Sequence, residues 1–441
     1  MKIEKLYKKV PTQLQLDNLV HFHQKGQYIE SEKLARLLTK EFPKHQFSWK
    51  VLGISLQQMG KLSEAVSANI KSVKLEPKDA EAHCNLGFSF LELGKLKDAE
   101  DSCRKSISLN PDYAGAHNNL GIVLKRLGKL EEAERSFRQA ITSNRYFAQA
   151  YKNLSTLLHD LCRLEEAEES CKQAIKIKPN YVNAFWNLSF FAKNIRDSEL
   201  WLDKCLLINP NHSDAVLMKA ALRFYQGDRS VYDNLINSNF KEHHYMRSFS
   251  WVFDLPKLPE LYFNRWHFFD EVVKKSILSR PFYEFGVWNG SSFKYLIKFF
   301  EKGYGFDVFT GLPEDWKVGS KIEKAGTYSN EGYIPDVKGG KFVAGKFEET
   351  LPIFFSKKNP MASIINFDAD LYSSTILALK YSKSVMDKDT ILIFDELIMT
   401  ESWEHDEFKA LNEFCSINNY TYEVQAISFL TKQVAVKLIG I

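Results

Sequence analysis

The sequence predicts a molecule of two parts: an all-α array of helical repeats, then an α/β domain with a mostly parallel sheet. Two observations predict this fold class. Small residues and prolines recur every 34 residues through the N-terminal half. Further on, apolar runs of strand length alternate with helical patterns. We therefore expect repeats over 11–230, a linker over 231–254 and the α/β domain over 255–441.

The composition is that of a folded protein, with 44% hydrophobic and 26% charged residues among 441. Its 59 basic and 55 acidic residues nearly balance, which gives no reason to expect a nucleic-acid partner or an anionic membrane. We found no run of the ~20 apolar residues that a membrane-spanning helix needs. The six cysteines are scattered without a C-x-x-C pair, which favours reduced thiols over disulfides or a zinc site. We expect a cytoplasmic protein with no membrane span.

Each repeat places apolar residues at helical spacing on both sides of a glycine turn. This pattern predicts two short antiparallel helices in every unit. Small residues at fixed positions let the helices approach closely, and prolines close the units. The recurring positions are Gly26, Gly60, Gly94 and Gly128 at the turn, Gly53, Gly87 and Gly121 within the first helix, and Pro43, Pro77, Pro111 and Pro179 at the end.

The units around Leu86-Gly87 and Leu120-Gly121, and the turn Leu127-Gly128-Lys129-Leu130-Glu131-Glu132-Ala133, resemble the tetratricopeptide (TPR) repeat. The resemblance implies a solenoid whose concave groove binds a protein or peptide. Asparagines at similar register could hold an extended peptide by amide hydrogen bonds, or could simply be solvated; these are Asn85, Asn118, Asn119 and Asn153. His83 and His117, which also lie 34 apart, are interpreted as packing residues and not as metal ligands.

Between 231 and 254 the repeat register is lost. The pair His243-His244 has no carboxylate or cysteine at ligand spacing nearby, so we expect surface residues and not a metal site. Beyond it, strand-like runs such as FYEFGV, ASIINFD and TILIFDE alternate with helices, which predicts a mostly parallel sheet covered on both faces. Two last runs, YTYEVQAISFL and QVAVKLI, predict an antiparallel edge hairpin.

A glycine turn follows the first expected strand, in the run Glu284-Phe285-Gly286-Val287-Trp288-Asn289-Gly290-Ser291. Glycines there let a ligand approach the backbone closely, although the turn could also be purely structural. The spacing G-x-x-x-G differs from the dinucleotide fingerprint, which disfavours a nicotinamide or flavin dinucleotide. Asp307 ends the second strand and could accept hydrogen bonds from the ribose hydroxyls of a nucleoside.

Carboxylates gather at the ends of the fourth and fifth expected strands. Asp368 and Asp370 are two residues apart, so strand alternation should point them the same way. Asp395 and Glu396 end the next strand. Like charges so close raise one another's pKa unless a divalent cation neutralises them, and Mg²⁺ suits oxygen ligands. The alternative is two acidic loops that are solvated independently.

The motifs EFGVWNGSS, DVFTGLPEDW, VAGKFEETLP, FDADLYSST and FDE, in this order, resemble the macrocin O-methyltransferase family over about residues 255–441. The resemblance implies a Rossmann-like class I methyltransferase that uses S-adenosylmethionine (SAM) and Mg²⁺ to methylate sugar hydroxyls. It implies Mg²⁺ ligands at Asp368, Asp395 and Glu396, and a general base at Asp370. One departure is Glu396, where the family usually has a second aspartate.

The sequence thus predicts a SAM-dependent O-methyltransferase that acts on a hydroxyl of a sugar or glycan, with the repeats recruiting a partner or substrate. We expect SAM to be held by the glycine turn and the next strand end, at Glu284, Gly286, Val287, Gly290, Ser291 and Asp307. His405 is a second candidate base, although such a histidine is more often a solvated residue at a helix start. Two alternatives stay open: a TPR scaffold with a degenerate methyltransferase-like domain, and a methyltransferase with a protein acceptor.

Overall fold

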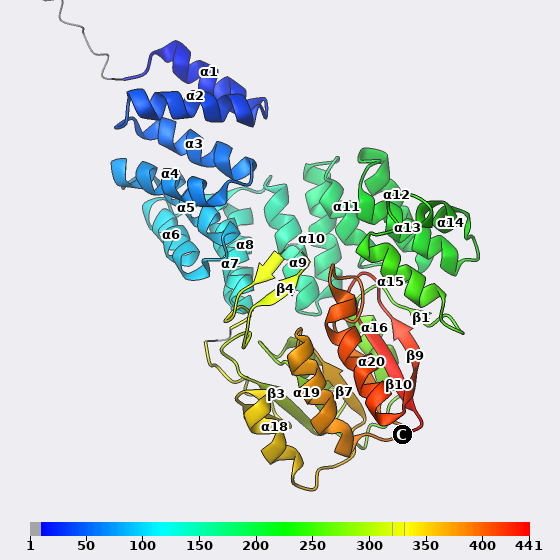
Figure 1. The fold of residues 1–441 in the computed structure, drawn as a ribbon. Coiled ribbons are helices and arrows are strands. Elements are labelled where there is room, and N and C mark those ends of the chain that lie inside the picture. Colours follow the sequence, from blue (N-terminus) through cyan, green and yellow to red (C-terminus); the bar gives the residue numbers. More distant parts are fainter. Residues whose placement is uncertain (1–9, 320, 330) are drawn as a thin grey trace, which may run out of the picture. The chain divides into compact units, whose positions relative to one another are not determined.

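The computed structural model describes residues 10–319, 321–329 and 331–441, and Figure 1 shows it as a ribbon. The chain forms two compact units. Unit 1 ends at Leu157, and unit 2 runs from Leu158 to Ile441. The division lies inside one helix, well before the predicted linker at 231–254.

Unit 1 consists of antiparallel helix pairs, coloured blue to cyan in Figure 1. The glycines at the turns within the pairs have positive φ angles, 71°, 72°, 73° and 73° at Gly26, Gly60, Gly94 and Gly128. Side chains with a Cβ avoid that conformation, which explains why glycine recurs there. The helices are α1 (Gln13–Gln24), α2 (Tyr28–Glu41), α3 (Gln46–Gln58), α4 (Leu62–Leu75), α5 (Ala80–Glu92), α6 (Leu96–Leu109), α7 (Ala114–Arg126), α8 (Leu130–Ser143) and most of α9 (Ala148–Asp160).

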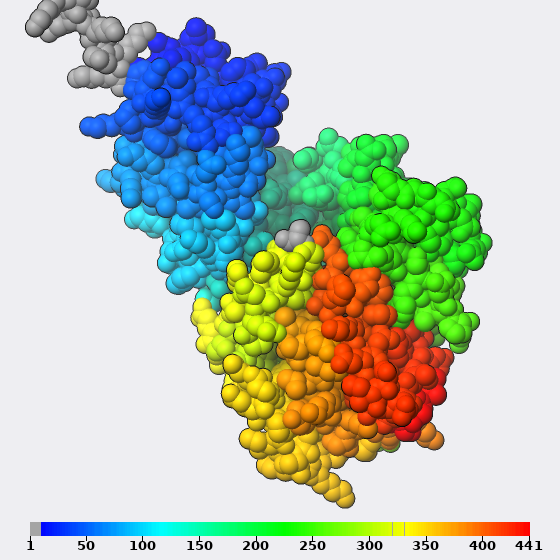
Figure 2. All heavy atoms as spheres, viewed as in Figure 1, coloured from blue at the N-terminus to red at the C-terminus, as the bar shows by residue number. Residues whose placement is uncertain are grey.

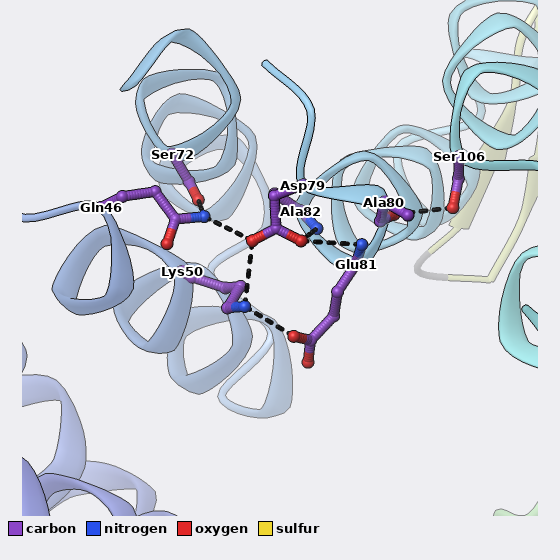
Figure 3. A network of polar contacts seen from close by, with 8 residues as sticks. All are labelled: Gln46, Lys50, Ser72, Asp79, Ala80, Glu81, Ala82 and Ser106. Atoms are coloured by element: carbon purple, nitrogen blue, oxygen red, sulfur yellow. Dashed lines mark hydrogen bonds and ion pairs between the residues drawn. The ribbon is translucent and has the colours of Figure 1, made fainter. Parts of the chain in front are cut away.

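Neighbouring repeats in unit 1 are also joined by polar contacts around the start of α5 (Figure 3). One Asp79 oxygen caps α5 by accepting hydrogen bonds from the backbone N–H groups of Glu81 and Ala82, at 2.9 and 3.1 Å. The other oxygen accepts from Gln46 Nε2 at 2.7 Å and Lys50 Nζ at 3.1 Å, both on α3. One side chain therefore satisfies a helix end and ties it to the preceding repeat.

The repeated histidines are packing residues, as predicted. His83 and His117 are each 9% exposed. Their Nε2 atoms lie 3.0 and 2.7 Å from the carbonyl oxygens of Pro77 and Pro111, the prolines that close the preceding repeats. Each histidine thus fastens the loop between two repeats.

Unit 2 contains the remaining helices and all the strands of the described chain. Its helices are α10 (Leu164–Ile177), α11 (Val182–Ser189), α12 (Ile195–Ile208), α13 (Ser213–Tyr225), α14 (Ser230–Ile236), α15 (His244–Phe253), α16 (Arg265–Lys274), α17 (Ser291–Leu296), α18 (Phe347–Phe355), α19 (Tyr372–Ser382) and α20 (Glu407–Asn418), with short 3-10 turns η1 (Lys383–Val385) and η2 (Trp403–His405). Its strands are β1 (Glu260–Leu261), β2 (Phe282–Phe285), β3 (Gly303–Asp307), β4 (Trp316–Val318), β5 (Lys321–Glu323), β6 (Gly340–Ala344), β7 (Ile364–Phe367), β8 (Ile391–Phe394), β9 (Thr421–Ile427) and β10 (Val434–Ile439).

The main sheet has the strand order β1-β9-β10-β8-β7-β2-β3-β6, and β4 and β5 form a separate hairpin. All neighbours in the main sheet are parallel except β10, which is antiparallel to both β8 and β9. The mostly parallel sheet is therefore confirmed. The predicted hairpin exists, but β10 lies inside the sheet and β1 pairs outside β9. A strand of two residues such as β1 is too short for its pattern to reveal it.

Helices cover both faces of this sheet. Phe282, Ile364 and Ile393 point to the face that packs against α16 and α17. Tyr283, Ile365 and Phe394, one position away in their strands, belong to a core with residues of α19 and α20. This alternation is the period of two expected for strands buried on both faces.

The last helices before the sheet share this second core. Leu202, Leu217 and Phe249, from α12, α13 and α15, belong to the same cluster as Phe394. Trp266 Nε1 on α16 donates to the carbonyl oxygen of His159, at 2.6 Å. Figure 2 shows the green helical part of unit 2 in unbroken contact with its red part.

The segment 231–254, predicted as a linker, is largely helical, because it contains α14 and α15. Phe249 of α15 packs against Phe429, with ring centroids 4.9 Å apart. The histidines at the start of α15 are half-buried and not surface residues, and their rings stack with centroids 4.4 Å apart. The aromatic-rich sequence hides its helical period because several of its faces are packed.

Candidate functional site

The candidate site lies at the carboxyl ends of the strands, where the order of the sheet reverses. β2 has β3 on one side and β7 on the other, so the chain connections diverge between β2 and β7. Ligands of open α/β sheets bind in the crevice at such a point. Most of the predicted site residues follow β2, β3, β7 and β8, and therefore lie along this edge.

Backbone strain concentrates at the same edge. Nine non-glycine residues of the described chain have positive φ angles, and seven of them lie in the loops after β2, β3, β7, β8 and β9 or in the segment between β5 and β6. Strained conformations of this kind cluster at functional sites. The seven are Trp288, Phe309, Tyr328, Glu331, Asp370, Met399 and Lys432.

The glycine turn after β2 brings two loops into direct contact. Gly286 has a φ of 87°, and a Cβ added there would lie 1.8 Å from the carbonyl oxygen of Asp368. No other residue fits this position. Gly290, with a φ of 77°, is the residue before α17. Ser291 follows it, and its hydroxyl donates to Asn289 Oδ1 at 2.7 Å.

Asp307 organises this turn. Its Oδ2 accepts hydrogen bonds from the backbone N–H groups of Val287 and Trp288, both at 2.7 Å, and its Oδ1 accepts from Phe309 N at 2.6 Å. A carboxylate has about four lone-pair sites. Asp307 thus keeps capacity for about one more donor, less than the pair of ribose bonds that the sequence suggested.

Glu284 is buried, with 1% of the residue exposed, and neither carboxyl oxygen has a hydrogen-bond partner. Burial raises its pKa well above the usual value, and the nearby Arg265 opposes this rise. A buried polar group without a partner is costly. Glu284 is therefore a candidate contact for a ligand.

Asp368 and Asp370 follow β7, which ends at Phe367, so strand alternation does not orient them. Asp370 instead has a φ of 59°. Burial raises the pKa of both carboxyls well above the usual value, and Asp395 adds to the rise in each case. The two side chains therefore belong to one cluster, although the reason given by the sequence is wrong.

Asp395 and Glu396 are paired with cations. Asp395 Oδ2 lies 2.5 Å from the guanidinium of Arg265, and its Oδ1 accepts from Gln433 Nε2 at 2.6 Å. Glu396 Oε1 lies 2.8 Å from Lys432 Nζ. Neither Arg265 nor Lys432 could be predicted from the sequence, because neither belongs to a motif and Arg265 is 130 positions from its partner.

A further carboxyl, Glu407 at the start of α20, was also missed. Its Oε2 accepts from the backbone N–H of Glu396 at 3.1 Å, while its buried Oε1 has no partner. Burial raises its pKa well above the usual value. Tyr328 is affected by the same cluster, because burial and then Asp370 raise the pKa of its hydroxyl.

These carboxylates do not fit a Mg²⁺ ion. Both oxygens of Asp395 and one of Glu396 already accept bonds from protein donors. Across the described ranges, no three His, Cys, Asp or Glu side chains are grouped so that they could hold a metal. His405 lies on η2 and is exposed, which favours the interpretation as a solvated residue over that as a second base.

In unit 1 the predicted asparagine ladder is largely bonded within the protein. Asn153 Nδ2 donates to Asn118 Oδ1 at 2.8 Å, and Asn118 is 2% exposed. Asn119 Nδ2 lies 3.3 Å from Cys84 Sγ. Asn85 Nδ2 is buried with no partner. A separate cavity of ≈ 520 Å³ between α6, α7 and α8 is lined by Arg104, Leu120, Leu124 and Arg135, among others.

Comparison with known families identifies the repeats. Models of the tetratricopeptide repeat match residues 80–113, 102–135 and 148–181. The N-terminal part of the chain is thus built from TPR repeats, which suggest a protein-interaction scaffold. No curated protein sequence matches the chain. No described helix is both long and apolar enough to cross a bilayer.

Several solved structures are similar in part. The crystal structure of the APC/C hetero-tetramer Cut9-Hcn1 aligns at 18% identity and a TM-score of 0.44, over 47% of this chain and 42% of that one. PilF of Pseudomonas aeruginosa aligns at 18% identity and 0.41, over 46% and 96%. YrrB, described as a TPR protein with an unusual peptide-binding site, aligns at 21% identity and 0.32, over 42% and 97%. The chain thus spans 42% of the first of these proteins and nearly all of the other two.

Proposed function

We propose that unit 2 transfers the methyl group of SAM to a hydroxyl of a sugar or glycan, and that the TPR repeats recruit a protein or peptide partner or the substrate. The order of the strands supports this proposal. An open, mostly parallel sheet with its switch point between β2 and β7 is compatible with the Rossmann-like fold that the methyltransferase resemblance implies.

The single observation that carries the proposal is the glycine turn after β2. Its backbone is fixed by Asp307, Gly286 excludes any side chain, and Glu284, two residues before Gly286, is buried without a hydrogen-bond partner. These features fit SAM, whose cationic groups would offset the charge of Glu284. Val287, Gly290 and Ser291 would complete the wall of the cofactor site.

When bound, SAM supplies an electrophilic methyl group. The chain's own task is then to orient an acceptor hydroxyl and remove its proton. Asp370, at the strained turn after β7, would take this role, and its raised pKa would make its carboxylate a stronger base than that of an ordinary aspartate. Trp288 and Tyr328, whose ring centroids are 5.8 Å apart, offer aromatic surface beside it for a sugar ring.

Isothermal titration of the full chain with SAM tests the cofactor site. We expect binding to the wild-type protein and at least ~10-fold weaker binding to Asp307→Ala, because the turn loses a carboxylate that accepts three bonds. Asp315→Ala is the matched control, since Asp315 pairs with the exposed Lys324. If the wild-type protein gives no heat with SAM, unit 2 is not a SAM-dependent enzyme and the TPR scaffold is the better reading.

The class of acceptor is tested with labelled SAM and a cell extract separated into protein, glycan and small-molecule fractions. Label in the glycan fraction is the expected result. Label in the protein fraction would instead identify the acceptor as a protein. Asp370→Asn, which keeps the shape of the side chain and removes the base, should lower transfer ~10²-fold or more.

A further inference from the structure

The carboxylates around Asp395 form a cluster with two basic side chains built into it. The groups that act most strongly on Arg265 by electrostatics are Asp395, Asp368, Asp160 and Glu396. Those that raise the pKa of Lys432, against the effect of its burial, are Glu396, Asp395 and Asp370. Each of the three carboxylates that the sequence assigned to Mg²⁺ therefore faces Arg265, and two of them also face Lys432.

Arg265 is held in place by the start of α16. Its neighbour Asn264 is fully buried and caps the helix, with Oδ1 accepting from His267 N at 3.0 Å. The guanidinium reaches Asp395 Oδ2 while Gln433 Nε2 binds Oδ1. Asp395 is thus bonded through both oxygens, and only 9% of its side chain is exposed.

Lys432 is held by its backbone. Its φ of 68° is unusual for a residue with a side chain, and it lies in the loop between β9 and β10. From there the ammonium lies 2.8 Å from Glu396 Oε1. A strained backbone at a charged residue is expected where the position of the charge matters.

We propose that Arg265 and Lys432 are resident cations of this site: they occupy, beside Asp395 and Glu396, the places that a divalent ion would need, so the site works without a metal. The inference rests on the proposed function for its chemistry but not for its test. Arg265 is a positioning residue that holds Asp395. Lys432, at the open side with 36% of its side chain exposed, is the charge that an acceptor hydroxyl would meet.

The test is a titration of the full chain with Mn²⁺ alone, in which binding is measured by electron paramagnetic resonance. We expect the wild-type protein to bind no tighter than ~1 mM, the range of weak oxygen sites. Lys432→Met and Arg265→Met should each bind Mn²⁺ at least ~10-fold more tightly, because one positive charge is removed from among carboxylates. Lys432→Arg, which keeps the charge, should behave as wild type.

Lys275→Met is the matched control, since Lys275 forms a 2.6 Å ion pair with Glu260 away from the cluster. It should leave Mn²⁺ binding unchanged. Micromolar Mn²⁺ binding by the wild-type protein would overturn the proposal, and so would variants at Lys432 and Arg265 that bind no better than the control. Circular dichroism checks folding; if Arg265→Met unfolds, Lys432→Met still decides.

The two proposals fail separately. SAM titration on the same samples reports on the cofactor site, and Mn²⁺ binding reports on the cations. If the wild-type protein does not bind SAM but Lys432→Met binds Mn²⁺ more tightly than wild type, only the proposed methyl transfer is refuted. If the wild-type protein binds SAM and also binds Mn²⁺ tightly, only the proposal of resident cations is refuted.

Discussion

Single glycines set the spacing of the TPR helices. A Cβ added to Gly121 would lie 2.6 Å from Cε1 of Phe137, which is 1% exposed and cannot move into solvent. Gly87 is similarly close to Cys103, with a Cβ at 2.7 Å from the sulfur. Close packing between helices therefore requires glycine at these two positions. The glycines at the turns are required instead by their positive φ angles.

Gly121→Ala should destabilise unit 1 by ~1–3 kcal/mol, because a tightly packed core tolerates added volume poorly. The measurement is denaturant unfolding followed by circular dichroism. Gly115→Ala in the same helix is the control: its nearest neighbour would be 3.6 Å away, so its unfolding free energy should stay within ~0.5 kcal/mol of wild type or rise slightly. Equal losses in both variants would show that the close contact with Phe137 is not the cause of the loss.

At the residue scale the sequence predicted the acidic half of the site and missed the basic half. The acidic residues follow apolar runs of strand length, a pattern that can be recognised in the sequence. They are Asp368, Asp370, Asp395 and Glu396. Arg265 and Lys432 reach them from a helix start and a loop, and only the tertiary fold brings these together. Asp307 shows the other kind of limit, since a sequence cannot reveal that its oxygens are used by the backbone of the turn.

Among the helices, α15 is expected to depend on pH through the two histidines at its start. His243 caps this helix by accepting from Tyr245 N at 3.2 Å, and His244 stacks on it. Burial, and then the neighbouring His243, lower the pKa of His244 to about 4, while Asp214 and Glu401 act in the opposite direction and Arg247 in the same one. In the folded protein His244 is therefore neutral at pH 6.

The direction of this pH effect on stability follows from the number of protons that the unfolded and the folded chain bind. The unfolded chain takes up a proton at His244 near its ordinary pKa of ~6.5, while the folded chain does so only near 4. The stabilisation is fully present above pH ~6.5 and is lost as the pH falls toward 4. His244→Leu should lose less unfolding free energy than wild type between pH 7.5 and 5.0, measured with urea; His405→Asn, exposed on η2, should follow wild type.

A nuclear magnetic resonance titration of the His244 ring gives the direct check. A midpoint near 6.5 in the folded protein would contradict this account of α15. The sequence did not suggest it, because it predicted a surface pair in a linker. The contacts that bury the pair come from elements distant in the chain, and Arg247 of the same helix binds Glu404 of η2 at 2.5 Å.

For the molecule as a whole, the boundary between the two compact units lies within the repeats and not after them. The helices from α11 to α15 share one core with the sheet, so the last repeats are part of unit 2. The 34-residue period predicted helices only as far as about residue 230, and α14 and α15 lie almost wholly in the segment predicted as a linker. It could not predict what they pack against, because an apolar face looks the same whether the next repeat or a sheet covers it.

A fragment of residues 148–441, which keeps α9 whole, should fold and unfold cooperatively. A fragment of 255–441 lacks Met246, Phe249 and Val252, each fully buried in the whole chain, and should expose apolar surface in their place. Thermal circular dichroism and binding of the dye ANS separate the two outcomes. Equal melting temperatures for both fragments, with no dye binding, would show that the sheet is independent of the helices before it.

The interior position of β10 has a consequence for how the chain is made. β8 and β9 do not pair with each other; both pair with β10, which follows them in the sequence. While the ribosome is still adding residues 395–433, β8 has been synthesised but β10, its partner on one side, has not. The edge of β8 that includes Phe394 is therefore unpaired. Protection of that edge must wait for 434–439, so a pause in translation there would leave the nascent chain most exposed to aggregation and to chaperones.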